Sequence, residues 1–147
     1  AGAAGVRERH AAWVRQWDQR IAAWETQAEP LMGRTLVAQH STFGYLWEWL
    51  GLTQVADLEP RPGLPPTLAH LQRVLKDVAD DPPRFIVQAS YQDPQAGQWL
   101  AGRTGLPVKV LPATVTEQGR ASTLEGLFDE LIEQLLAALR ASEGARR

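Results

Sequence analysis

The first strong pattern along the chain is helical. Apolar residues recur at spacings of three and four between residues 6 and 28, as on one wide face of an α-helix. This apolar stripe consists of Val6, His10, Trp13, Val14, Trp17, Ile21, Trp24 and Ala28. The pattern predicts a helix over residues 7–32, ended by Pro30 and Gly33, after a flexible lead-in over residues 1–6. A helix of this length could bridge two domains or lie along the side of one.

Short apolar runs then alternate with helical patterns over residues 33–142. The runs predicted as strands are residues 35–38, 53–58, 84–89 and 108–111. Helices are predicted after them, and the residues expected at their starts are Ser41, Thr67, Asp93 and Ser122. This alternation predicts an α/β fold: a four-stranded, mainly parallel sheet with helices on both faces, hence a three-layer sandwich. The polar residues 143–147 are expected to form a frayed tail.

Composition and charge narrow the function classes. The 147 residues are 44% hydrophobic and 22% charged, which suits a single hydrophobic core. The formal net charge of −2 gives no electrostatic reason to expect nucleic acid as a partner. The absence of cysteine excludes disulfides and thiolate metal sites. The small, featureless residues 1–5 fit either a lead-in or a truncation point of a longer precursor.

His40 is the main candidate for chemistry. It directly follows the predicted strand 35–38 and precedes the helix expected near Ser41. This position is the carboxyl edge of the sheet, where ligands bind in open α/β folds. A neutral imidazole there can bind a metal or act as a base, and a nearby helix N-terminus disfavours its protonated form. From position alone, a hydrogen-bonded structural histidine is the alternative.

Asp93 is a weaker candidate at the same edge. Its carboxylate could ligate a metal, but an Asp before Pro94 is more typical of a helix cap. Glu59 could line a cleft or contact a partner, but a solvated loop charge is the preferred interpretation. His10 and His70 are interpreted as structural residues, His10 packed with a hydrogen bond. Zinc usually has three or four protein ligands, so one histidine is not a metal site. No sequence signature of a metalloprotease, a phosphate-binding loop or a nucleophile elbow is present.

Several short motifs together resemble the metal receptors of zinc and manganese ABC importers. In order, the motifs are Leu36-Val37-Ala38-Gln39-His40-Ser41-Thr42-Phe43-Gly44-Tyr45-Leu46, Leu50-Gly51-Leu52, Glu59-Pro60 with Pro66-Thr67, Ala89-Ser90-Tyr91-Gln92-Asp93-Pro94, Trp99-Leu100-Ala101 with Thr104-Gly105, and Leu111-Pro112-Ala113-Thr114-Val115. They span about residues 7 to 140. Each motif is modest, and the ordered set is fairly specific to this family, which includes adhesion-type lipoproteins.

The resemblance implies an organisation for the chain. Receptors of this family have two α/β lobes joined by one long rigid helix, and the metal is held between the lobes. The N-terminal lobe typically supplies two histidine ligands, and the third ligand comes from the position that His40 matches. The resemblance thus implies that residues 7–32 form the interlobe helix, that residues 33–142 form the C-terminal lobe, and that the N-terminal lobe is absent. It also implies a periplasmic or other extracytoplasmic, membrane-associated receptor that serves an ABC permease.

The chain departs from the family pattern at the fourth ligand. Many members supply an Asp in the loop after the last strand, and this chain has Leu111-Pro112-Ala113-Thr114 there. Water or Asp93 could fill that position. The imidazole of His40 favours Zn²⁺ over Mn²⁺, because carboxylate ligands suit manganese better. The single-lobe chain is expected to bind metal poorly or to be metal-free.

Two other readings remain. In the first, the chain is an α/β interaction domain without metal, and the Trp-rich face of the first helix is a partner surface or a dimer contact. In the second, His40 and Asp93 form the acid–base pair of a small enzyme. No nucleophile, phosphate cradle or cofactor fingerprint supports the enzyme, so the chain is predicted not to be one.

Overall fold

The structure is a computed structural model that describes residues 2–61 and 63–145. Its regular elements are, in order, α1 (Ala3–Ala28), β1 (Thr35–Ala38), α2 (Gly44–Leu50), β2 (Thr53–Asp57), α3 (Leu68–Asp80), β3 (Phe85–Ala89), α4 (Gln95–Thr104), β4 (Val108–Leu111) and α5 (Leu124–Ala145). Short 3₁₀ turns cover Glu29–Leu31, Ser41–Phe43 and Arg120–Ser122. Strands and helices alternate after α1, as the sequence predicts.

The four strands form one sheet in the order β2-β1-β3-β4, and every neighbouring pair is parallel. The predicted four-stranded sheet is therefore confirmed, and it is wholly parallel in the described chain. Its register places Ala38 beside Val87, and Val87 beside Lys109. Because all strands run in one direction, the loops that follow β1, β2 and β3 emerge at the same edge.

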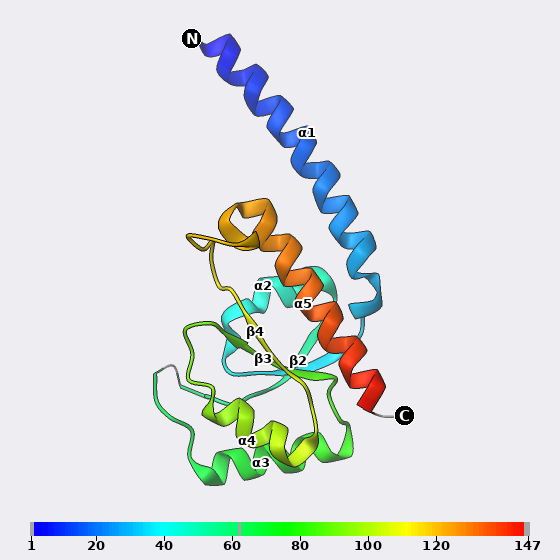
Figure 1. Ribbon diagram of the computed structural model, residues 1–147, viewed down its shortest axis with the longest axis vertical. Helices are drawn as coiled ribbons and strands as arrows, with labels where there is room; N and C mark the ends of the chain where they lie inside the picture. Colours follow the sequence, from blue (N-terminus) through cyan, green and yellow to red (C-terminus); the bar gives the residue numbers. More distant parts are fainter. Residues whose placement is uncertain (1, 62, 146–147) are drawn as a thin grey trace.

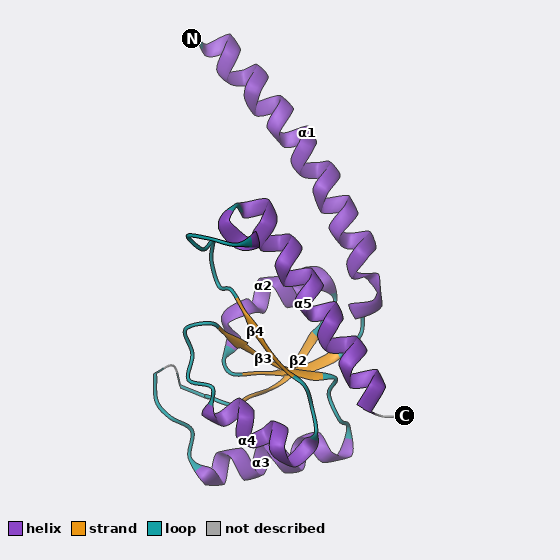
Figure 2. Cartoon of the chain, viewed as in Figure 1, coloured by secondary structure: helices purple, strands orange, loops and turns teal. Residues whose placement is uncertain are grey.

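Helices cover both faces of the sheet, which confirms the three layers (Figure 1, Figure 2). Alternate residues of each strand serve opposite layers. Leu36 and Ala38 pack with buried residues of α1, α2 and α5, whereas Val37 packs with those of α3 and α4. The strands are thus apolar on both sides, as expected for a buried parallel sheet.

The long helix α1 packs on the α/β body only through its second half. Trp24 and Ala28 are buried, Trp17 is half-buried, and Trp13 is 50% exposed. The first half of α1 extends beyond the body, past the start of α5 (Figure 1). The apolar stripe is therefore partly covered and partly exposed.

Both ends of the chain contain more helix than the sequence predicts. Helix α1 begins at Ala3, so residues 3–6 are helical where the sequence predicts a flexible lead-in, and Ala3 and Ala4 favour this conformation despite Gly5. Helix α5 continues to Ala145, and the buried Ser142 donates its hydroxyl to the Leu139 carbonyl within its C-terminal part. Residues 1, 146 and 147 lie outside the described residues.

The structure confirms some of the predicted helix caps and not others. Thr67 caps α3, since its hydroxyl accepts the amide hydrogen of His70 at 3.2 Å. The cap of α5 is Thr123 rather than Ser122, because the Thr123 hydroxyl accepts from the amide of Gly126. Ser41 makes no capping bond and lies in the 3₁₀ turn before α2. Among the described helices, none combines the length and apolar character needed to cross a bilayer.

Candidate functional site

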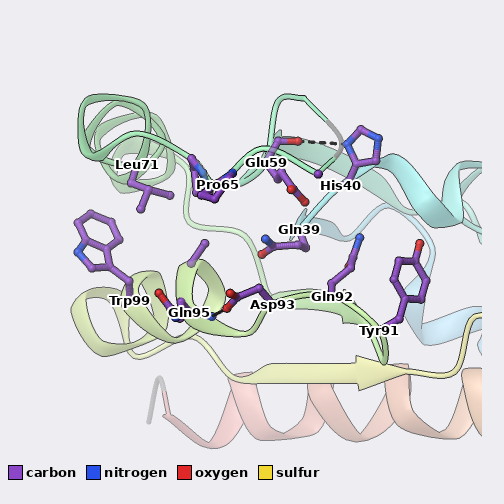
Figure 3. Close-up of a pocket in the computed structure, with 13 residues that line it drawn as sticks. Gln39, His40, Glu59, Pro65, Leu71, Tyr91, Gln92, Asp93, Gln95 and Trp99 are labelled. Carbon is purple, nitrogen blue, oxygen red and sulfur yellow. Dashed lines mark hydrogen bonds between the residues drawn. The ribbon is translucent and has the colours of Figure 1, made fainter.

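A cavity of about 560 Å³ lies at the carboxyl edge of the sheet (Figure 3). Gln39 and His40 reach it from the end of β1, Glu59 from the end of β2, and residues 91–93 from the loop after β3. The first residues of α3 and α4 close its other side. The cavity therefore lies where the sequence places its two candidate residues.

Backbone bonds beyond the strand ends fix the position of His40. The Gln39 amide donates to the Val87 carbonyl at 2.8 Å, and the Glu59 amide donates to the Gln39 carbonyl at 2.8 Å. The loops after β1 and β2 are thereby held side by side. His40, partly buried, has an extended backbone with φ −153° at the start of the 3₁₀ turn.

The ring of His40 is oriented by one hydrogen bond. Its Nδ1 atom lies 3.1 Å from the carbonyl oxygen of Glu59 (Figure 3). A carbonyl oxygen can only accept, so Nδ1 carries the hydrogen in this bond. The neutral ring then has its lone pair on Nε2, which is the atom available to a metal.

Asp93 acts as the cap that its sequence context favours. Its Oδ1 atom accepts the amide hydrogen of Gln95 at 2.8 Å, at the start of α4. His40 and Asp93 line the same cavity from different walls, and no hydrogen bond joins them (Figure 3). Each is bonded to a backbone group instead, so the acid–base pair of the enzyme hypothesis is not formed.

The other two histidines have no part in the cavity. His70 Nε2 lies 2.8 Å from the Asp57 carbonyl oxygen, which ties α3 to the end of β2 and confirms a structural role. His10 is exposed on α1, and its ring stacks on Trp13 with centroids 6.5 Å apart. Contrary to expectation, His10 makes no hydrogen bond with any described residue, because this part of α1 projects beyond the α/β body (Figure 1).

The sequence interpretation missed Gln39. Its side chain is 3% exposed and lines the cavity, and its Oε1 atom has no hydrogen-bond partner among the described residues. The alternation of side chains between the two faces of a strand could have indicated that Gln39 is buried. Val37 faces α3 and α4, so Gln39, two residues later, lies on the same face.

At the far end of the cavity lie Leu71 of α3 and Trp99 of α4 (Figure 3). Arg103 stacks on Trp99, with its Cζ atom 3.9 Å from the ring centroid, and donates to the Trp99 carbonyl. The cavity thus has a polar end at the sheet edge and an apolar end between the two helices.

A complete metal site is not present in this part of the chain. Among the described residues, no three His, Cys, Asp or Glu side chains gather closely enough to hold a metal ion. The loop after β4 carries no carboxylate at Pro112, Ala113 or Thr114. His40 is therefore a single oriented ligand group.

Comparisons with solved structures show the same fold in bacterial proteins that bind laminin or metals. A mutant of the laminin-binding adhesin Lmb from Streptococcus agalactiae is 23% identical with a TM-score of 0.69, over 87% of this chain and 48% of that one. A Cd-bound periplasmic metal-binding protein from Candidatus Liberibacter asiaticus is 18% identical with a TM-score of 0.71, over 88% and 50%. A Zn(II)-bound AdcAII variant from Streptococcus pneumoniae is 23% identical with a TM-score of 0.65, over 88% and 48%.

The chain spans about half the length of these proteins. No curated protein matches the sequence. At this level of identity, the likeness to solved structures shows the fold alone. The family follows from the sequence, because residues 1–140 match the family described as ZnuA, "Zinc-uptake complex component A periplasmic". The chain therefore belongs to the ZnuA family of periplasmic zinc-uptake components.

Proposed function

We propose that this chain is the C-terminal half of an extracytoplasmic receptor that captures a divalent metal between two lobes and delivers it to an ABC permease. Three facts support the proposal: the family match over residues 1–140, the coverage of about half of each metal-binding relative, and the position of His40 at the carboxyl edge of the sheet. The proposed site of action is the periplasm, after the family.

The observation that carries the proposal is the bond between His40 Nδ1 and the Glu59 carbonyl. Metal-binding histidines usually donate their second ring nitrogen to a carbonyl or carboxylate, which sets the tautomer and the ring orientation. Here the bond leaves the Nε2 lone pair unused by any described residue. The ring of His40 is thus oriented so that its Nε2 atom can bind one metal ion.

The other ligands would come from an N-terminal lobe that precedes α1. Asp93 remains a weaker ligand candidate, because Oδ1 holds the Gln95 amide and only Oδ2 is unengaged. Zinc is the proposed metal, since imidazole suits zinc, and manganese is the alternative. Water would complete the coordination where the loop after β4 lacks a carboxylate.

The proposed division has residues 7–32 as the interlobe helix and residues 33–142 as the C-terminal lobe. The first half of α1 projects from the body (Figure 1), and Trp13 and Val6 there are 50% and 54% exposed. An N-terminal lobe seated on this stretch would cover them. That burial would make the helix a rigid strut between the lobes.

Zinc titration by calorimetry tests the proposal on this chain and on a version extended with its native N-terminal sequence. We expect tight binding only in the extended protein, weakened at least 100-fold by His40→Ala and kept by His70→Ala, the matched histidine control. Manganese in the same titration reports the metal preference. Unchanged zinc affinity in the extended His40→Ala protein would refute the assignment.

The exposed part of α1 also favours a second function, an interaction surface that needs no metal. Val6, His10 and Trp13 are exposed along the projecting half of α1. If this face pairs two copies of the chain, sedimentation velocity will show a dimer that Trp13→Ser dissociates. A metal-free extended protein together with such a dimer would select this function over the receptor.

A further inference from the structure

The floor of the cavity contains a buried hydrogen-bond acceptor without a donor. Gln39 is 3% exposed and its Oε1 atom is unpartnered, and the same holds for Gln88, which is 5% exposed. Ala38 pairs with Val87, so the next residues, Gln39 and Gln88, lie on neighbouring strands and on the same face. An unpaired buried amide oxygen is costly, so a donor from a ligand at this place has a ready partner.

The carboxylates of Glu59 and Asp93 line the same end of the cavity as Gln39. Glu59 is half-buried, and its carboxylate makes no hydrogen bond or ion pair with any described residue. Asp93 uses Oδ1 for the Gln95 amide, and its Oδ2 is unengaged. No Lys or Arg among the described residues lines the cavity. The polar end therefore presents acceptors and negative charge, which favour a cationic donor.

The opposite end is apolar. Leu71 and Trp99 face each other across it, and Pro65 lies beside them (Figure 3). Arg103, beside this end, stacks on Trp99 and donates to the carbonyl of that residue. It is not part of the lining. A volume of about 560 Å³ is typical of sites for small organic ligands.

We propose that this cavity binds a small organic ammonium compound with an apolar or aromatic group. The ammonium has three donors and no acceptor, which matches Gln39 Oε1 together with the carboxylates of Glu59 and Asp93. The apolar group fills the space between Leu71 and Trp99. The ammonium end shares Asp93 with the proposed metal site, whereas the apolar end lies away from His40, whose Nδ1 is engaged by the Glu59 carbonyl (Figure 3).

The test is a nuclear magnetic resonance titration of the ¹⁵N-labelled chain with 2-phenylethylammonium. Phenylacetate serves as the probe of opposite charge and 2-phenylethanol as the neutral one. We expect only the ammonium compound to shift the Gln39 side-chain amide and the Trp99 indole resonance. Glu59→Gln and Asp93→Asn should each weaken its binding about tenfold. Asp93→Asn keeps an oxygen for the Gln95 amide, so the helix start is preserved.

Glu143→Gln is the matched control, because Glu143 is exposed on α5 and does not line the cavity. It should leave the affinity unchanged. The titration contains no metal ion, so its outcome is independent of the zinc experiment. Equal binding of phenylacetate would overturn the inference. So would the absence of shifts at Gln39 and Trp99, or an affinity unchanged in the double variant Glu59→Gln with Asp93→Asn.

Discussion

The indole nitrogen of Trp24 donates a hydrogen bond to Oδ1 of Asp129 at 2.7 Å, across 105 residues of sequence. The bond joins α1 to α5 at the place where α1 enters the core. Around it, the rings of Trp17, Trp49 and Phe128 pack on Trp24 or on one another with centroids 5.1–6.5 Å apart. These four aromatic residues form the aromatic cluster that attaches the second half of α1 to the body.

Replacing Trp24 by Ala should lower the free energy of unfolding by about 3–5 kcal/mol, because it removes the centre of this cluster. Asp129→Ala should cost about 1–3 kcal/mol, since the buried indole N–H loses its acceptor. Urea unfolding monitored by circular dichroism measures both. Trp13→Ala, at a half-exposed position, is the control and should cost well under 1 kcal/mol. Equal losses at Trp13 and Trp24 would contradict the cluster's role.

Gly51 ends α2 in the left-handed region, with φ 66°. A Cβ atom there would meet Met32 Cγ at 3.1 Å. Gly51→Ala should therefore destabilise the protein by about 1–2 kcal/mol. Gly44→Ala is the matched control, because Gly44 has helical φ −53° and open space around it. That change should be neutral or stabilising by up to about 1 kcal/mol, which thermal unfolding of the two variants can resolve.

Gln88 is buried on β3 with an unpartnered Oε1, and its neighbour across the layer is Gly97 of α4. Gln88→Met keeps the length of the side chain and removes the unpaired amide. We expect it to raise the free energy of unfolding by about 1 kcal/mol. Gln98→Met, at an exposed position of α4, should change little. A loss of stability in Gln88→Met would mean that the amide has a donor, such as a buried water.

Amide hydrogen exchange should divide α1 into two parts. Residues 3–14 project from the body (Figure 1), so their amides should exchange rapidly, whereas residues 17–28 should be protected by the aromatic cluster. Trypsin should accordingly cut first after Arg7, Arg9 or Arg15. In the extended protein, a lobe seated on α1 should slow the exchange of residues 3–14. Uniform protection along α1 in the isolated chain would contradict this division.

The sheet could be predicted because its signal is local. The run Leu36-Val37-Ala38 is apolar at every position, which is typical of a strand buried on both faces. The N-cap of a helix was less predictable where two residues with hydroxyl side chains are adjacent. Ser122 and Thr123 are equivalent by type, and the 3₁₀ turn at Arg120–Ser122 leaves the capping position to Thr123.

The position of His40 at the sheet edge could also be predicted, but its orientation could not. The bond to Glu59 depends on β2 lying directly beside β1, and the sequence does not state the strand order. The burial of Gln39 could not be predicted for a related reason. A glutamine after a strand is usually a solvated loop residue, and only the packing of α3 and α4 shows that it is buried.

Helix α1 is attached to the α/β body only along its second half, so its first half can move like the arm of a lever. Its fulcrum is the aromatic cluster around Trp24, and its free arm runs from Trp17, the first residue of that cluster, back to Ala3, about 21 Å at 1.5 Å per residue. A tilt of about 5° at the fulcrum displaces the tip of that arm by about 2 Å. A small rearrangement among Trp17, Trp49 and Phe128 would therefore produce a larger displacement at the N-terminal end of the helix.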